Sequence, residues 1–320
     1  GRAYLGPGGF AQAALDPDGA PALAAGARGG AVLKPPGRPP GDLTSPGCLM
    51  VLGMHRSGTS AVSLSLRVFG ARHGDRLVGG LTSNPRGHWE DIDVLRLNER
   101  MFEAIHTRWD SPSPVTPRDV RHLMGKGFVE AAAGLLRDKI AANGFYALKD
   151  PRMTKLLPFW RKAFQAAEIQ PYSVIVFRNP ASVVASLRKR DNLPPIQGYL
   201  LWASHMLECF RYARHFAHFF VNYDEFIENP EKILTAVANR FRLSVNAGEF
   251  EMIARDFLDK SLRHTKFDAR YLCDDAGCPR EIALAYEQML RMLSSGCPGT
   301  DNFINFVKSL RDCLRNAGLI

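Results

Sequence analysis

The sequence has few of the features that mark membrane, secreted or metal-bound proteins. Its 320 residues include no stretch of 18 apolar residues, so we expect no membrane span. No basic segment followed by an apolar one opens the chain, so we expect no secretory signal. The six cysteines form no Cys-x-x-Cys pair, which favours free thiols over a zinc site or a disulfide framework. These absences predict a cytoplasmic protein that needs no metal.

Composition and charge divide the chain into two parts. Gly, Ala and Pro supply 28 of the first 46 residues, so residues 1–46 are predicted to be a disordered linker. Residues 47–320 are predicted to form one domain with a helical C-terminal part. The net charge of +9 favours an anionic partner, such as a polyphosphorylated cofactor, an acidic polymer or nucleic acid.

Short apolar runs alternate with segments of helical periodicity, which predicts a three-layer α/β/α fold with a central, mainly parallel sheet. Strands are predicted at 48–54, 145–148, 172–177 and 218–226. Helices are predicted at 61–71, 94–105, 118–142, 181–190, 197–216 and 231–241. The polar clusters HRSGTS, KDPR and RNP directly follow strands, so we expect them along one edge of the sheet, where ligands of such folds bind.

The clearest motif is GMHRSGTS, Gly53–Ser60, between the first strand and the first helix. It matches the P-loop pattern except that Thr59 replaces the lysine, and Arg56 supplies a positive charge from within the loop. The loop predicts a P-loop-like phosphate cradle. The alternative is a glycine turn that merely caps the helix with Ser57 or Thr59. The candidate phosphate-binding residues are His55, Arg56, Ser57, Gly58, Thr59 and Ser60.

A nucleoside triphosphatase would also need a magnesium-binding acid at a strand end. Only Asp150 is available, and Lys149 precedes it, so the loop is predicted to bind a phosphate without a metal. A second motif places Arg178 directly after the third strand and Ser186 eight residues later in a helix. A guanidinium and a hydroxyl at this spacing could hold a separate phosphate. The alternative is a solvated arginine at a strand-to-helix turn.

With these two motifs in order, the chain resembles the sulfotransferases that use 3′-phosphoadenosine 5′-phosphosulfate (PAPS). The likeness spans residues 48–265 and is greatest to the bacterial branch with an HRSGTS loop, which often acts on carbohydrates. The resemblance implies that the loop binds the 5′-phosphosulfate and that Arg178 and Ser186 bind the 3′-phosphate. It implies PAPS as co-substrate and a hydroxyl acceptor, in particular a saccharide, and no nucleic-acid partner. Where many relatives have a lysine, Arg56 would polarise the bridging oxygen during transfer.

The loop NPRGHWED, 84–91, is the candidate source of a general base, which must take the proton of the acceptor hydroxyl. Relatives place a glutamate after the first helix, so the resemblance favours Glu90, with His88 as the second choice. The alternative is a capping role only, because Asp91 or Asp93 suits an N-cap.

Lys149 is the fourth candidate, since relatives have a lysine that touches the sulfate or the acceptor. Its alternative is a salt-bridged turn, in which Arg152 pairs with Asp150 instead of contacting the acceptor. A late basic segment, Lys260–His264, is a weaker match to the part that closes the cofactor site in cytosolic relatives.

Two other functions remain open at the sequence level. One is a P-loop small-molecule kinase or ATPase, and the other is a polyanion-binding module without catalysis. The missing P-loop lysine and the additional arginine site disfavour the first, and the absence of a recognisable nucleic-acid-binding motif disfavours the second.

Overall fold

The computed structural model describes residues 47–79, 87–213, 215–256, 267, 269–294 and 300–320. The predicted linker at 1–46 and the basic segment Lys260–His264 lie outside the described residues. Among the described helices, none is long and apolar enough to cross a membrane.

The centre of the fold is a four-stranded parallel sheet with the strand order β2-β1-β3-β4. Its strands are β1 (Gly47–Gly53), β2 (Phe145–Lys149), β3 (Tyr172–Phe177) and β4 (Ala217–Asn222). β2 and β3 are buried along their whole length, and β1 is buried after its first residue. Burial on both faces explains why these strands are continuous apolar runs in the sequence.

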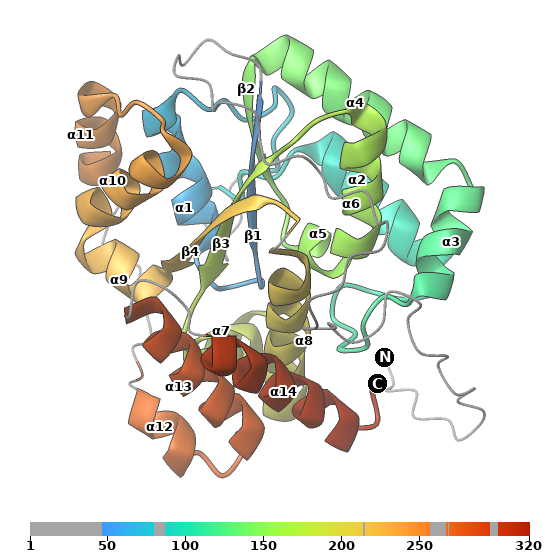
Figure 1. Cartoon of the computed structure of the whole chain (residues 1–320), viewed down its shortest axis with the longest axis vertical. Helices are drawn as coiled ribbons and strands as arrows, with labels where there is room; N and C mark the ends of the chain where they lie inside the picture. The colour runs from blue at the N-terminus through green and yellow to red at the C-terminus, as the bar shows by residue number, and fades with distance from the viewer. Residues whose placement is uncertain (1–46, 80–86, 214, 257–266, 268, 295–299) are drawn as a thin grey trace.

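Alternate residues of β1 enter two separate cores, so the sheet is the middle of three layers. Met50 and Leu52 pack in the core formed with α4 (Phe128–Asn143), α6 (Leu157–Ala167) and α8 (Pro195–Ala213). Leu49 and Val51 pack in the core formed with α1 (Thr59–Ser65), the following 3₁₀ turn η1 (Leu66–Phe69) and α10 (Pro230–Phe241). Figure 1 shows the two helical layers on opposite sides of the sheet. The predicted P-loop-like α/β/α class is confirmed.

The remaining helices extend these layers and close the carboxyl end of the sheet. The C-terminal hairpin of α13 and α14 packs on α8, and helices make up most of the described residues after β4 (Figure 1). The bounds are α2 Ile92–Ala104, α3 Pro117–Gly125, α5 Arg152–Lys155, α7 Pro180–Asp191, α9 Tyr223–Glu228, α11 Ala247–Asp256, α12 Ala269–Asp274, α13 Arg280–Ser294 and α14 Thr300–Asn316.

Two predicted elements were wrong in extent. The single helix expected at 118–142 is α3 and α4, separated at Gly127, whose φ of 76° is incompatible with a continuous helix. The strand expected at 218–226 ends at Asn222, because the Asn222 side chain accepts a hydrogen bond from the Asp224 amide (3.0 Å) and begins α9. Helix α6 was not predicted.

Candidate active site

The glycine loop connects the carboxyl end of β1 to α1 and depends on close backbone packing. Gly58 has a φ of 86°, and a Cβ at this position would overlap the ring of Tyr223, the first residue of α9. Only glycine therefore allows this contact. Gly58 is also the N-cap of α1, and no side chain caps the helix. Capping by Ser57 or Thr59 is thus not observed, and the first-turn amides remain available to a ligand.

Arg56 joins the glycine loop to the second motif. Its Nε donates a hydrogen bond to Ser186 Oγ in α7 over 2.8 Å, across 130 residues of sequence. The backbone of Arg56 has a φ of 67°, a conformation that is uncommon outside glycine. Burial, together with repulsion from Arg190 and Arg178, lowers the pKa of Arg56. The arginine side chains therefore concentrate positive charge here, which suits an anionic ligand.

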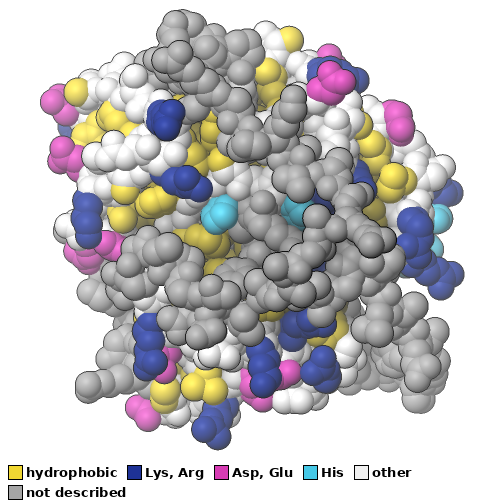
Figure 2. Space-filling model, viewed as in Figure 1, with side chains coloured by type: hydrophobic (Ala, Val, Ile, Leu, Met, Phe, Trp, Pro, Cys, Tyr) yellow, Lys and Arg dark blue, Asp and Glu magenta, His cyan; other side chains and the backbone are white. Residues whose placement is uncertain are grey.

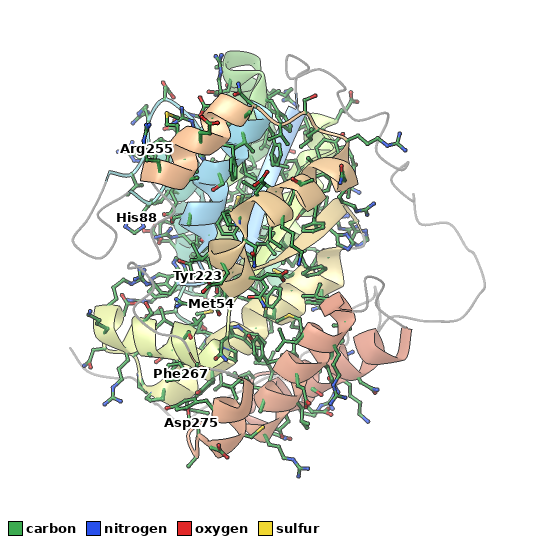
Figure 3. The ribbon with its side chains drawn as sticks, turned by 90° about the vertical axis from the view of Figure 1, so that its left-hand side faces the viewer. Met54, His88, Tyr223, Arg255, Phe267 and Asp275 are labelled. Atoms are coloured by element: carbon green, nitrogen blue, oxygen red, sulfur yellow. The ribbon has the colours of Figure 1, made fainter. Side chains whose placement is uncertain are left out.

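Arg178 follows β3 and is held at the same end of the sheet. It is 7% exposed, its guanidinium carbon lies 5.0 Å from the centre of the Tyr223 ring, and its Nε lies 3.8 Å from Asp224 Oδ1. Its carbonyl accepts a hydrogen bond from Trp202 Nε1 (3.1 Å). The side chain is not the solvated arginine of the alternative interpretation. In Figure 3, the labels of Met54 and Tyr223 lie next to each other in the middle of the molecule, just above helices α7 and α8.

Lys149 ends β2 and ties the glycine loop to the loop that carries His88 and Glu90. Its ammonium donates to Glu90 Oε1 (2.6 Å), to the His88 carbonyl (2.8 Å) and to Ser60 Oγ (3.2 Å). Three acceptors match the three protons of an ammonium group. In this arrangement Lys149 positions two loops.

Glu90 is 5% exposed and has both carboxylate oxygens engaged. Oε1 contacts Lys149, and Oε2 lies 3.2 Å from Arg152 Nη1. Burial alone would raise its pKa, but the two ion pairs prevail and hold the pKa of Glu90 below its usual value. Arg152 also pairs with Asp150 Oδ1 (3.0 Å) and with Glu99, so the salt-bridged turn considered for KDPR is present.

His88 has a different environment two residues earlier. It is partly buried, and its Nε2 has no hydrogen-bond partner among the described residues. Burial, followed by repulsion from Lys149, Arg190 and Arg56, lowers the pKa of His88, although the charge of Glu90 opposes this shift. The imidazole is therefore neutral at pH 7 and able to accept a proton. Asp91 caps α2 by accepting a hydrogen bond from the Asp93 amide (2.9 Å), so the capping role belongs to Asp91 rather than to Glu90.

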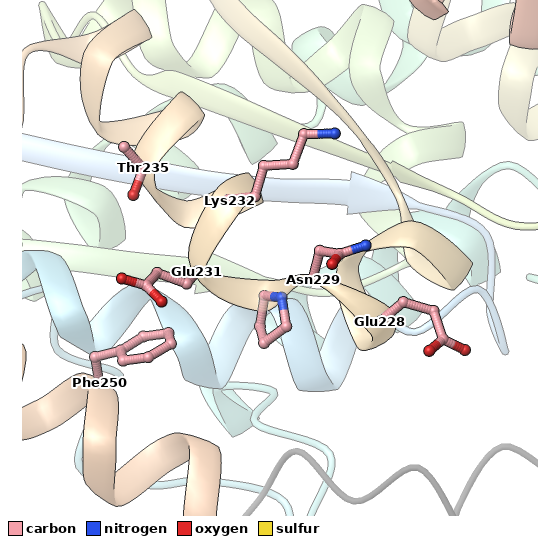
Figure 4. A pocket seen from close by; sticks show the side chains of 7 residues that line it. Glu228, Asn229, Glu231, Lys232, Thr235 and Phe250 are labelled. Atoms are coloured by element: carbon pink, nitrogen blue, oxygen red, sulfur yellow. The ribbon is translucent and has the colours of Figure 1, made fainter.

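A cavity of about 380 Å³ lies beside these groups and is lined by His88, Glu90 and Arg152 together with His55 and Trp109. His55 is 7% exposed, and its ring centre lies 4.6 Å from that of Trp109. A larger groove of about 610 Å³ lies elsewhere, lined by residues of α10 and by Phe250 of α11, and Figure 4 shows Glu231 of α10 beside Phe250. Of these two cavities, only the first is lined by predicted site residues, namely His55, His88 and Glu90.

The structure thus brings the predicted residues to one end of the sheet in two adjoining groups. Arg56, Ser186 and Arg178 form one group beside the glycine loop, and Lys149, Glu90 and His88 form the other. Sequence reasoning missed Tyr223 and Trp109. Tyr223 was placed inside the fourth strand, although an aromatic residue just past a strand end is a candidate for this edge.

Comparisons with known proteins add little information about the function. No protein-family description and no curated protein matches the chain. Two solved structures resemble part of it. The sulfotransferase domain of the Synechococcus PCC 7002 olefin synthase is 15% identical, with a TM-score of 0.40 over 70% of this chain and 86% of that domain. The sulfotransferase domain of the curacin biosynthetic pathway is 13% identical, with a TM-score of 0.38 over 64% of this chain and 76% of that domain. We base no assignment on likenesses of this size.

Proposed function

We propose that this protein is a sulfotransferase that moves a sulfuryl group from PAPS to a hydroxyl of a saccharide. The observation that carries the proposal is the hydrogen bond between Arg56 and Ser186, which unites the glycine loop with the second motif. Arg178 is close enough to Arg56 to lower its pKa by repulsion, and the Arg178 guanidinium lies over the Tyr223 ring. A ligand with two separate anionic groups matches this arrangement.

The residues fit the PAPS donor in charge and in hydrogen-bonding groups. The uncapped start of α1 and Arg56 would hold the 5′-phosphosulfate, and Arg178 with Ser186 would hold the 3′-phosphate. Ser57 Oγ is fully buried and has no hydrogen-bond partner among the described residues, which leaves a donor in the loop for a ligand oxygen. When bound, the donor supplies an activated sulfuryl group.

For the chemistry, we assign proton acceptance to His88 and positioning to Glu90 and Lys149. The acceptor oxygen forms a bond to sulfur, the bond from sulfur to the phosphate oxygen breaks, and the acceptor proton passes to His88 Nε2. Arg56 stabilises the negative charge that develops on the departing phosphate oxygen. Glu90 is the weaker candidate for base because both of its oxygens are held by cations.

A kinase or ATPase is disfavoured by the state of Asp150, the only acid at a strand end that the sequence offered for magnesium. Its Oδ2 accepts a hydrogen bond from Asn98 Nδ2 (2.9 Å), and its Oδ1 pairs with Arg152. The carboxylate is therefore already engaged by the protein.

A polyanion-binding module would need clustered basic side chains. On the face shown in Figure 2, the described Lys and Arg side chains lie mainly toward the rim, and several have Asp or Glu beside them. Exposed ion pairs such as Arg291 with Glu287 and Lys232 with Glu225 contribute to this mixed surface. The mixed surface gives little support to a polyanion-binding function. The buried arginine site supports binding of a small anionic ligand instead.

Ligand-dependent melting tests the assignment. The product 3′,5′-bisphosphoadenosine should raise the melting temperature, because a ligand that binds only the folded state stabilises it by mass action. ATP should do so less, because it lacks the 3′-phosphate. Equal stabilisation by the two nucleotides would contradict the proposal, and so would binding of the bisphosphate without transfer of labelled sulfate to any saccharide, phenol or lipid alcohol.

A further inference from the structure

His55 and Arg56 are adjacent in the glycine loop but face different surroundings. Arg56 bonds to Ser186 on the donor side. His55 lines the cavity with His88 and lies against Trp109. Although the P-loop pattern groups both residues as phosphate ligands, the structure separates them.

The imidazole of His55 is buried, and one of its two ring nitrogens is unsatisfied among the described residues. It is 7% exposed, and its Nε2 has no hydrogen-bond partner among the described residues. The ring is held between Trp109, at 4.6 Å, and His205, at 6.5 Å between ring centres. An unsatisfied buried polar atom is costly, so a ligand or water that reaches it is stabilised.

The charged groups of the cavity are paired with one another. Arg152 is held by three carboxylates, and Arg190 pairs with Asp191 (2.7 Å). Val78 and Leu95 add apolar surface. A cavity with paired charges, apolar walls and two histidines suits a neutral ligand with several hydroxyl groups better than an anionic or cationic one.

We propose that His55 is an acceptor-binding residue that holds a second hydroxyl of the acceptor while His88 acts on the reacting hydroxyl. The acceptor is therefore a neutral polyol with at least two hydroxyls, both of which reach this one cavity. This inference rests on the proposed sulfotransferase function, and it moves His55 from the donor site to the acceptor site. His55 determines specificity and takes no part in proton transfer.

The test uses two alcohols that differ by one hydroxyl, cyclohexanol and trans-1,2-cyclohexanediol, with labelled PAPS and the full chain. The measured quantity is the ratio of kcat/KM for the diol to that for the mono-alcohol. His55→Phe removes the hydrogen-bonding group, so the ratio should fall by about two- to tenfold, the range of one neutral hydrogen bond. The statistical advantage of the diol is the same in every variant and cancels from this comparison.

Two variants serve as controls. His55→Gln keeps a donor and an acceptor and should retain most of the ratio, whereas Val78→Ala changes an apolar wall of the same cavity and should affect both alcohols alike. The affinity for 3′,5′-bisphosphoadenosine should stay unchanged in all three variants.

Each other outcome overturns the inference. An unchanged ratio in His55→Phe shows that His55 does not hold the second hydroxyl, and a loss of bisphosphate affinity in the same variant returns His55 to the donor site. If the unsubstituted chain binds the bisphosphate but sulfates neither alcohol, the polyol assignment is wrong while the donor site stands. If it does not bind the bisphosphate at all, the sulfotransferase function itself fails.

Discussion

Glu90 and His88 lie two residues apart in one loop, yet their surroundings give them different chemistry. The Glu90 carboxylate is clamped between Lys149 and Arg152, so its pKa lies below the usual 4.5. The His88 ring is partly buried, so its pKa lies below 6.5. The sequence showed both residues but not these partners, because Lys149 and Arg152 come from a different strand end about 60 positions later.

The pH dependence of kcat/KM separates the two candidate bases. If His88 is the base, the rate should fall with acid in a limb that lies below pH 6.5, where His88 becomes protonated. In Glu90→Gln this limb should move to lower pH, because the negative charge that raises the pKa of His88 has been removed. A limb that does not move in Glu90→Gln, or one that lies above pH 6.5, would contradict this assignment.

His88→Asn should lower kcat by about 10²–10⁴, the usual effect of losing a general base. Its affinity for 3′,5′-bisphosphoadenosine should remain unchanged, because His88 lies outside the donor group. Glu90→Gln, in contrast, should also lower the melting temperature, because a broken buried ion pair costs about 3–5 kcal/mol. Near-normal turnover of His88→Asn with a saturating acceptor would exclude His88 as the base.

On the donor side, Arg178→Ala should weaken bisphosphate binding, whereas Arg56→Ala should chiefly lower kcat. The 3′-phosphate is held alike in the ground and transition states, but the charge beside Arg56 develops during transfer. Loss of a donor such as Arg56, which stabilises charge in the transition state, commonly lowers the rate by about 10²–10³. Titration calorimetry and steady-state kinetics check the two effects, and an Arg56→Ala variant altered only in cofactor affinity would refute the catalytic role.

At the scale of elements, local signals in the sequence located the strands well but not every helix boundary. Three of the four strands are buried apolar runs, and each of the four was found to within four residues of its observed ends. The break between α3 and α4 was missed because Gly127 and Gly134 look alike in sequence, although only Gly127 has a left-handed backbone. Periodicity alone does not show which glycine breaks a helix.

These two glycines give a matched pair of substitutions. Gly134→Ala should stabilise the protein by about 0.5–1 kcal/mol, because Gly134 is inside α4 and a Cβ there would meet nothing within 4 Å. Gly127→Ala should destabilise it by about 1–2 kcal/mol, because a φ of 76° is unfavourable for alanine, even though the space is equally open. Chemical denaturation measures both, and shifts of the same sign would show that α3 and α4 are one helix in solution.

At the scale of the whole molecule, the strand order determines which residues lie around the glycine loop. The order β2-β1-β3-β4 places the ends of β2 and β3 on either side of the glycine loop, so Lys149 and Arg178 reach it from opposite sides. The rule that ligands bind at the carboxyl ends of parallel strands predicted a common edge. It did not predict which side chains meet there. The contacts of Tyr223 with Gly58 and Arg178 depend on how α9 leaves β4, which no local pattern encodes.

Buried histidines should make the whole fold sensitive to mild acid. Burial lowers the pKa of His73 to about 4 and that of His205 to about 3, and it lowers the pKa of His55 well below 6.5. In the unfolded chain these residues bind protons near pH 6.5, so below that pH the unfolded state holds more protons than the folded state. Stability should therefore decrease as the pH falls from 6.5 toward 4, by up to about 1.4 kcal/mol per pH unit for each histidine.

Thermal melts at steps from pH 7.5 to 4.5 test this expectation with a matched pair of variants. His73→Gln replaces a partly buried ring that hydrogen-bonds to Ser63 (2.9 Å), so its melting temperature should vary less with pH than that of the unsubstituted chain. His122→Gln alters an exposed residue of α3 and should leave the pH dependence unchanged. Near pH 7.5 all three proteins should show little slope from these histidines, because each is then mostly neutral in both states. A melting temperature that stays constant down to pH 4.5, or a His73→Gln variant with the full slope, would show that His73 is not held neutral by burial in the folded protein.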